Sequence, residues 1–213
     1  MTSHYVDYTI TLPEVQSGEI SHLLGRLWQR LHGVLAADDI QHLGISLPAL
    51  AAKHPGNVLR LHSDAKTLQQ VKANAGMHQL AEMAGIRVGD VQPTPQYCQY
   101  RSFTRSRGGE KLTHAGCARQ EARWLKRLQA QGKPITVDLI LARREHFKQQ
   151  RMQSLASTVY LRLNSVSTHQ QFSLIIQTSV ATTEPQTGKF SHYGLAVADQ
   201  DKEEALATVP WFV

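Results

Sequence analysis

Cysteine is scarce in this chain of 213 residues, and long apolar runs are missing from it. Two cysteines, Cys98 and Cys117, are too few for a disulfide framework or a four-cysteine zinc site, so we interpret both as reduced thiols. No stretch approaches the roughly 20 apolar residues that span a bilayer. The first residues lack the basic and then apolar pattern of a signal peptide. We therefore expect no membrane association and a cytoplasmic location.

Positive charge is concentrated in one part of the sequence. Residues 101–151 hold 13 of the 23 Lys and Arg residues but only 4 of the 17 Asp and Glu residues. This segment therefore carries +9, whereas the rest of the chain carries −3. Solvated surfaces usually mix charges of both signs, so the segment favours a face that binds a polyanion such as a nucleic acid.

The first half of the chain alternates between strand and helix patterns. Apolar residues alternate along residues 4–12, and they recur every three or four positions along residues 18–36. Shorter patterns follow: strands at 42–48, 58–62 and 86–91, and a helix at 64–74 that continues over 77–83. The order strand, helix, strand, strand, helix, strand predicts a ferredoxin-like (βαββαβ) domain over residues 1–92.

The second half, residues 93–213, has a different pattern and begins at Pro93-Thr94-Pro95. We predict an exposed strand at 97–105, a flexible turn at 107–109, and helices at 110–131 and 137–151. Three strands follow at 158–164, 171–178 and 189–196, and the apolar end at 209–212 is expected to dock on the core. The fold class is therefore α+β, with an RNA- or DNA-binding second half that contains basic helices.

A basic stripe is predicted on the first helix of this half. Its members recur at three- and four-residue spacing and share one face: Arg119, Arg123, Lys126 and Arg127. Lys111 lies at the start of the same predicted helix, and three further cations lie just upstream, within reach of the same ligand: Arg101, Arg105 and Arg107. Guanidinium groups suit phosphate oxygens and guanine edges, but the pattern does not separate RNA from DNA.

Histidine is abundant, with 11 residues, but no pair has the spacing of a known metal-binding signature. We therefore expect neither a metal nor a cofactor. His32 differs from the others because it follows Leu31 of the apolar helix stripe and lies about 100° around the helix from it. Such a border residue is partly sheltered and still reaches a cleft, although its position alone favours a packing role.

Hydroxyl groups cluster in Asn164-Ser165-Val166-Ser167-Thr168. By themselves these residues favour a turn whose hydroxyls bond their own backbone, and the alternative is a site for a ribose or phosphate. Phe172 and Tyr193 each present a ring that stacks on a base or, more commonly, packs in a core.

Several motifs together resemble the type I-F CRISPR-associated endoribonucleases. They are His4-Tyr5-Val6-Asp7, Leu31-His32-Gly33, Gly44-Ile45-Ser46-Leu47-Pro48, Ser165-Val166-Ser167-Thr168 before Gln171-Phe172, Tyr193-Gly194-Leu195 and Val209-Pro210-Trp211-Phe212. Each motif is weak, but their order and spacing along nearly the whole chain are specific. The step of twelve residues from His32 to Gly44 matches the family without a gap, which favours His32 over Trp28 as its catalytic position.

The resemblance implies a metal-independent cut in CRISPR precursor RNA at the base of the repeat hairpin, leaving a 2′,3′-cyclic phosphate and a 5′-hydroxyl. The protein would keep the 3′ stem-loop and join the Cascade surveillance complex, being a monomer outside it. By position, His32 would be the general base, Ser165 would hold the ribose and Tyr193 would shape the pocket. Phe172 would stack on the lowest base pair. The scissile phosphate would contact Ser167 and Thr168.

The chain departs from the family in its basic helix, where a dense arginine cluster near the start is replaced by Thr113-His114-Ala115-Gly116. The two positions that read the lowest base pairs fall on Ser102 and Thr104, so we predict that Arg101 or Arg105 reads them instead. This divergence is similar to the transposon-associated branch of type I-F systems.

Two other interpretations of the sequence stay open. One is a non-catalytic subunit that binds structured RNA, with His32 as a packing residue. The other is a ferredoxin-like sensor of a small ligand fused to a DNA-binding half.

Overall fold

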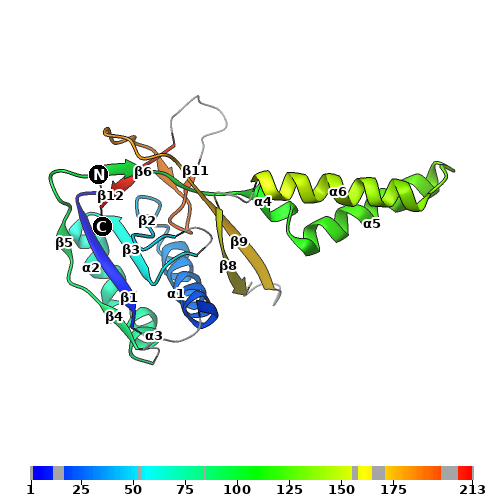
Figure 1. Cartoon of the computed structure of the whole chain (residues 1–213). Helices are drawn as coiled ribbons and strands as arrows, with labels where there is room; N and C mark the ends of the chain where they lie inside the picture. Colours follow the sequence, from blue (N-terminus) through cyan, green and yellow to red (C-terminus); the bar gives the residue numbers. More distant parts are fainter. Residues whose placement is uncertain are drawn as a thin grey trace.

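The computed structural model describes residues 2–11, 17–51, 54–83, 85–154, 158–164, 171–197 and 206–212 (Figure 1). Within these residues the chain forms two larger β-sheets, a two-stranded sheet and a helical hairpin. The mixed architecture confirms the predicted α+β class.

The first sheet has the strand order β2–β3–β1–β4, with all pairs antiparallel. Its strands are β1 (His4–Ile10), β2 (Gly44–Ser46), β3 (Val58–Ser63) and β4 (Ile86–Val88). This order, with helices after β1 and β3, is the ferredoxin-like topology expected from the sequence. A short strand, β5 (Gln92–Pro93), pairs with the start of β1, so the expected boundary segment extends this sheet.

Three helices lie between the strands of this sheet in the chain: α1 (Ser17–Ala37), α2 (Ala65–Ala73) and α3 (Ala75–Met83). The apolar stripe of α1 is buried, as its three- and four-residue spacing predicts, and Leu24, Leu27 and Leu31 are fully inaccessible. The side chain of Asp64 caps α2 by accepting a hydrogen bond from the Thr67 amide at 2.9 Å.

The second sheet has the order β10–β11–β7–β9–β8. Its strands are β7 (Phe103–Arg105), β8 (Thr158–Asn164), β9 (Gln171–Thr178), β10 (Lys189–Phe190) and β11 (Ala196–Val197). The predicted strands at 158–164 and 171–178 are confirmed. The single strand predicted at 189–196 is wrong, because the chain turns back there and Phe190 pairs with Ala196.

The strand predicted at 97–105 is also divided in two. β6 (Gln99–Arg101) pairs with the C-terminal β12 (Val209–Trp211), whereas β7 belongs to the second sheet. Ser102 lies between them and is buried, with its hydroxyl donating to the Ala207 carbonyl at 2.9 Å. The expected docking of the apolar C-terminal residues is confirmed, since β12 pairs with β6 and Val209 is buried.

The helical hairpin projects from the body of the molecule (Figure 1). It consists of α5 (His114–Ala130) and α6 (Val137–Ser154), and a short helix α4 (Arg107–Lys111) lies at its root. The flexible turn predicted at 107–109 is therefore wrong: the Ser106 hydroxyl caps α4 by accepting from the Gly109 amide at 3.2 Å. The Thr113 hydroxyl caps α5 in the same way, so this helix begins later than the predicted residue 110.

One apolar core contains residues from both halves of the chain, including Leu27 and Leu31 from α1 and Leu161 and Leu163 from β8. Gly25 permits the close approach of α1 to β8, because a Cβ atom there would lie 2.6 Å from the carbonyl oxygen of Arg162. The division into domains 1–92 and 93–213 stays a prediction.

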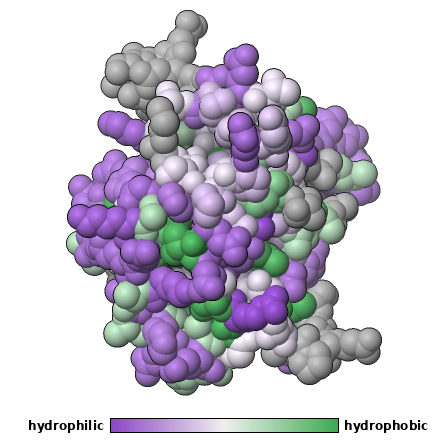
Figure 2. Space-filling view, turned by 90° about the vertical axis from the view of Figure 1, so that its left-hand side faces the viewer, coloured by the Kyte–Doolittle hydropathy of each residue, from purple (hydrophilic) through white to green (hydrophobic). Residues whose placement is uncertain are grey.

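The end of the molecule opposite the hairpin is largely hydrophilic, with only small apolar patches (Figure 2). No helix in the described part of the chain is long and apolar enough to cross a membrane.

Candidate active site

His32 lies on α1 at the border of the core and is half-buried, as the sequence predicts. Its Nδ1 atom is 3.0 Å from the carbonyl oxygen of His192. A carbonyl only accepts hydrogen bonds, so Nδ1 carries the proton in this contact. In the neutral ring Nε2 then holds a lone pair, and it has no hydrogen-bond partner among the described residues. The fold thus orients one histidine nitrogen and leaves the other available for a proton.

Tyr193 fixes the plane of this imidazole. The two rings are stacked, with 3.9 Å between centroids and 6° between planes. The Tyr193 carbonyl accepts a hydrogen bond from Nε1 of Trp28 at 2.9 Å, and Trp28 is fully buried. Trp28 therefore supports the turn that carries Tyr193. Gly194 completes that turn with φ of +69°, a conformation that residues with a side chain rarely adopt.

The same turn is also held by a contact between the side chains of His192 and Asp39. His192 Nε2 lies 2.9 Å from Oδ1 of Asp39. Hydrogen bonds from Gln41 and from His192 lower the pKa of the Asp39 carboxyl, so Asp39 stays ionised at neutral pH. The carbonyl that orients His32 thus belongs to a residue whose own side chain is anchored.

Arg105 lies between Tyr193, which stacks on His32, and a second aromatic residue, Phe172. Its guanidinium carbon lies 5.7 Å from the ring centroids of both Tyr193 and Phe172. Glu110 holds the guanidinium with two hydrogen bonds, of 2.7 and 3.0 Å, and this pairing raises the pKa of Arg105. Burial raises the pKa of the Tyr193 phenol, so Tyr193 stays neutral beside a permanent cation.

A cleft of about 330 Å³ opens next to Arg105 and Phe172. Three arginines from separate elements line it: Arg105 from β7, Arg119 from α5 and Arg162 from β8. Glu110 is the one acidic residue in the lining, and both its oxygens bind Arg105. Arg119 and Arg162 form no ion pair with any described residue. Cations that converge without a counter-charge favour an anionic ligand such as a phosphate.

The remaining members of the basic stripe, Arg123, Lys126 and Arg127, are exposed on α5. They make no ion pair within the described ranges, so the stripe continues the positive surface beyond the cleft. Arg107 and Lys111 are exposed on α4, a helix separate from α5.

Arg101 is placed differently from Arg105. It lies on β6, and its guanidinium carbon is 4.6 Å from the ring centroid of Trp211. Of the two arginines predicted to read the hairpin, only Arg105 lies beside Tyr193 and Phe172. Ser102 is buried, so its side chain is not available to a base at the surface.

Ser165, Ser167 and Thr168 lie outside the described residues. The residues that flank this segment, Asn164 and Gln171, are paired across β8 and β9. The Asn164 amide donates a hydrogen bond to Oε1 of Gln29 at 3.3 Å. Gln29 precedes His32 by three positions on α1, and residues at this spacing share one face of a helix. Asn164 therefore lies beside a residue that is one helical turn from His32.

Two residues of the site were missed in the sequence. Arg162 lies at an outward position of β8, as Tyr160 and Asn164 do. The alternation of buried and exposed residues along this strand would therefore have predicted that Arg162 is exposed. Glu110 carried no such signal, because its role depends on the fold of α4 against β7. Among the described residues, no group of three His, Cys, Asp or Glu side chains is arranged to hold a metal ion.

The fold and the site define a class: a ferredoxin-like α+β protein with an oriented histidine beside an arginine-lined cleft. The model of the family described as CRISPR-associated protein (Cas_Csy4) matches residues 5–212. A protein of Escherichia coli (strain UTI89 / UPEC), named CRISPR-associated endonuclease Cas6/Csy4, is 29% identical over 210 residues, covering 98% of this chain and 99% of that protein. The chain belongs to the Cas_Csy4 family, which confirms the resemblance of its motifs.

Proposed function

We propose that this protein is an endoribonuclease that cuts CRISPR repeat precursor RNA at the base of a hairpin. The name of the E. coli relative and the match to the family support the reaction class. The observation that carries the proposal is the geometry of His32, whose Nδ1 is bonded to the His192 carbonyl while Nε2 has no partner among the described residues.

RNA supplies its own nucleophile in this reaction. Nε2 of His32 takes the proton of the 2′-hydroxyl, and the 2′-oxygen attacks the adjacent phosphorus. The bond from phosphorus to the 5′-oxygen breaks, and that oxygen takes up a proton, giving a 2′,3′-cyclic phosphate and a 5′-hydroxyl. The carbonyl of His192 stabilises the imidazolium that forms, since it accepts a hydrogen bond from Nδ1 in either charge state.

Ser165 is proposed to hold the ribose in the attacking conformation, with Ser167 and Thr168 near the scissile phosphate. The entry of this segment beside Gln29 supports a location close to His32. Orientation of reacting groups contributes much of the rate in such intramolecular attacks. No step in this scheme requires a metal ion or a cofactor.

The cleft is proposed to bind the foot of the hairpin. Phe172 stacks on the lowest base pair, and Arg119 and Arg162 contact phosphates. Arg105 is the better candidate for reading a guanine edge, because Arg101 is stacked on Trp211. The basic stripe then follows the stem, so the protein keeps the 3′ stem-loop after the cut as a subunit of a Cascade surveillance complex. This role is carried out in the cytoplasm, by a protein that is a monomer outside the complex.

The test is single-turnover cleavage of a repeat hairpin by the purified protein. Cleavage is expected to persist in excess chelator and to vanish when a deoxyribose occupies the cleavage position, with binding retained. Ser165→Ala is expected to slow the cut with little loss of affinity. Tight binding without any cleavage of the all-ribose hairpin would instead support the non-catalytic subunit, in which the stacked His32 only packs against Tyr193.

A further inference from the structure

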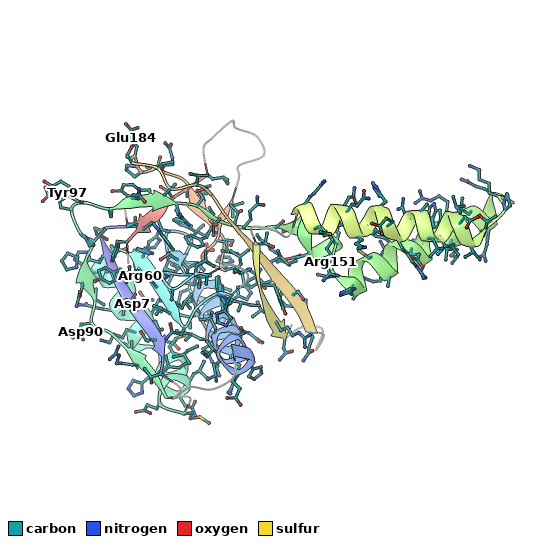
Figure 3. All side chains as sticks on the ribbon, in the orientation of Figure 1. Asp7, Arg60, Asp90, Tyr97, Arg151 and Glu184 are labelled. Carbon is teal, nitrogen blue, oxygen red and sulfur yellow. The ribbon has the colours of Figure 1, made fainter. Side chains whose placement is uncertain are left out.

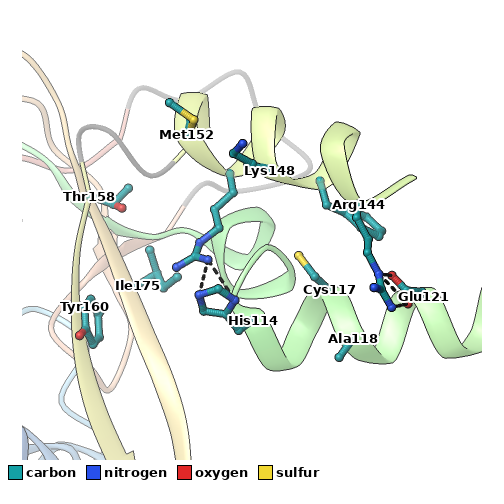
Figure 4. Close-up of a pocket in the computed structure, with 12 residues that line it drawn as sticks. His114, Cys117, Ala118, Glu121, Arg144, Lys148, Met152, Thr158, Tyr160 and Ile175 are labelled. Atoms are coloured by element: carbon teal, nitrogen blue, oxygen red, sulfur yellow. Dashed lines mark hydrogen bonds and ion pairs between the residues drawn. The ribbon is translucent and has the colours of Figure 1, made fainter. Parts of the chain in front are cut away.

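A second pocket, larger than the cleft of the candidate site, lies apart from it where α5 and α6 meet the second sheet (Figure 4). Its volume is about 870 Å³. Cys117 and Glu121 of α5 line it, and each lies two residues from a member of the basic stripe. Residues two apart on a helix point about 200° from each other. The pocket and the basic stripe therefore occupy opposite sides of α5.

The floor of this pocket is mainly apolar. Three of its lining residues are buried, and two of them, Phe147 and Ile175, are apolar, whereas Thr158 has a hydroxyl. Ala118 and Cys117 of α5 and Met152 of α6, which is 69% exposed, add apolar surface. None of the five apolar side chains offers a strong hydrogen-bond donor or acceptor. An apolar concavity at the root of a projecting hairpin marks a surface on which apolar groups gain by burial.

The rim of the pocket is basic. Arg144, Lys148 and Arg151 follow one another along α6 at four- and three-residue spacing, so they share one face. Arg144 pairs with Glu121 across the pocket at 2.7 Å, and Lys148 pairs at 3.4 Å with Glu145, which does not line the pocket. Arg151 contacts the imidazole of His114, which brings no negative charge (Figure 4). The rim is therefore net positive above an apolar floor.

We propose that this pocket docks a segment of a partner protein that presents apolar side chains flanked by Asp or Glu residues. The apolar side chains fill the floor, and the acidic residues meet Lys148 and Arg151. RNA fits less well, because nucleobase edges would lose hydrogen bonds to water without replacement on this floor. The inference rests on the proposed function only in taking the partner to be a subunit of the same RNA–protein complex.

The test uses a synthetic amphipathic peptide with leucines at positions i, i+3, i+4 and i+7 and glutamates beside them. Its binding to the full-length protein is followed by fluorescence anisotropy. Two matched peptides serve as controls, one with lysine in place of glutamate and one with serine in place of leucine. Both are expected to bind at least about tenfold more weakly than the first peptide. Equal binding of all three would overturn the proposal.

Variants of the pocket test the location. Ala118→Glu places a charge in the apolar part of the pocket, and Arg151→Glu reverses a rim charge; each is expected to weaken binding about tenfold or more. Gln150→Glu is the matched control, because Gln150 is exposed on α6 and does not line the pocket. Ala118 is also exposed, so its variant is expected to fold, which thermal unfolding checks. Unchanged affinity in both pocket variants would contradict the proposal.

The two cysteines separate a protein ligand from RNA. Cys117 lines the pocket and Cys98 does not, and both are half-buried. The leucine–glutamate peptide is expected to protect Cys117, but not Cys98, from a thiol reagent. Repeat hairpin RNA is expected to leave Cys117 reactive and the peptide bound. Protection of Cys117 by the hairpin, or its displacement of the peptide, would show an RNA site here and overturn the inference, whether or not the protein cleaves RNA.

Discussion

The imidazole of His32 lies flat on the ring of Tyr193, with 3.9 Å between the ring centroids, although α1 and the turn before β11 are far apart in the chain. The hydrogen bond from His32 Nδ1 to the neighbouring His192 carbonyl completes the arrangement. Stack and hydrogen bond together fix the ring in plane and in rotation, and they leave Nε2 as the nitrogen that can take a proton.

Replacement of His32 is expected to slow cleavage strongly while binding is retained. Loss of a general base costs roughly 10²- to 10⁴-fold in rate, so His32→Ala should slow single-turnover cleavage by that factor. The affinity for the hairpin should change little, because the arginines of the cleft are untouched. His32→Phe is the matched variant, since it restores an aromatic stack on Tyr193 without a proton acceptor. Wild-type cleavage by His32→Phe would show that the residue only packs.

Tyr193 is expected to act through its ring and not through its hydroxyl. A stacked aromatic pair is worth about 0.5–1.5 kcal/mol, so Tyr193→Ala should lower the cleavage rate by up to about tenfold as His32 loses its orientation. Tyr193→Phe keeps the ring and should cleave at close to the wild-type rate. Because burial raises the pKa of the phenol, Tyr193→Phe should also leave the shape of the pH–rate profile unchanged. If Tyr193→Phe adds or removes a pH-dependent change in the cleavage rate, the hydroxyl takes part in the reaction, which would contradict a role of the ring alone.

Hairpin binding is expected to depend strongly on salt. If about five cations contact phosphates, the logarithm of the affinity should fall against the logarithm of salt concentration with a slope of roughly −3.5 to −4.5. Alanine at Arg119, Arg123, Arg127 or Arg162 should reduce the slope by about one each. Arg144→Ala is the control, because Arg144 pairs with Glu121 on the other side of α5. A flat salt dependence would mean that the binding face lies elsewhere.

Affinity measurements on a hairpin with altered lower base pairs test which arginine recognises those base pairs. Arg105→Ala should cost about 1–3 kcal/mol on the cognate hairpin and much less on the altered one. Arg101→Ala is the comparison, since Arg101 stacks on Trp211. Equal losses on both hairpins would show that Arg105 contacts only the backbone.

Stability is expected to fall in mild acid because of His62. This side chain is fully buried beside Ser46, and burial, with a contribution from Arg60, lowers its pKa from 6.5 to about 3. Between these values the unfolded chain binds a proton that the folded protein does not. The free energy of unfolding is therefore retained above pH 6.5 and falls below it, by up to about 1.4 kcal/mol per pH unit.

Thermal unfolding from pH 7.5 to 4.5 checks this expectation. His62→Leu removes the titrating group and should flatten the pH dependence of Tm, whatever its effect on Tm at pH 7.5. His22→Gln is the control, because His22 is exposed on α1. An equally steep decline in His62→Leu would assign the acid sensitivity to other groups.

The ion pair between the half-buried Asp7 and the buried Arg60 is expected to be a strong determinant of stability (Figure 3). Arg60 is 7% exposed, binds both oxygens of Asp7 at 2.7 and 2.9 Å, and donates to the Phe212 carbonyl at 2.8 Å. Asp7→Ala leaves this buried cation without its partner, at a cost of about 3–5 kcal/mol in the free energy of unfolding.

A matched surface pair provides the comparison. Asp90 is 90% exposed and pairs with Lys72 at 3.1 Å. Asp90→Ala should cost less than about 1 kcal/mol, since water screens such pairs. Denaturant unfolding of both variants measures the difference, and similar losses would mean that the pair of Asp7 and Arg60 adds little.

Periodicity determined which elements form. The alternation in β1 and β8 and the apolar stripe of α1 depend on which side chains face the core, and that information is local. The ferredoxin-like order followed from these elements because few sheet topologies accept them. Motifs spread over the chain likewise indicated the family. The concentration of positive charge in residues 101–151 predicted where the basic hairpin lies.

The tertiary structure decided what these elements bring together. The sequence predicted a turn at 107–109 and one helix over 110–131, whereas the structure has two helices, α4 and α5. The side chains of Ser106 and Thr113 cap the starts of these helices, and such side chain to backbone hydrogen bonds compete with helix continuation. Where a strand was predicted over 189–196, the chain forms a turn that places Tyr193 against His32. The positive φ of Gly194 makes this turn possible. Arg105 entered the site, whereas Arg101 stacks on Trp211, since β6 and β7 join different sheets. Such pairings depend on contacts between distant residues, which no local pattern encodes.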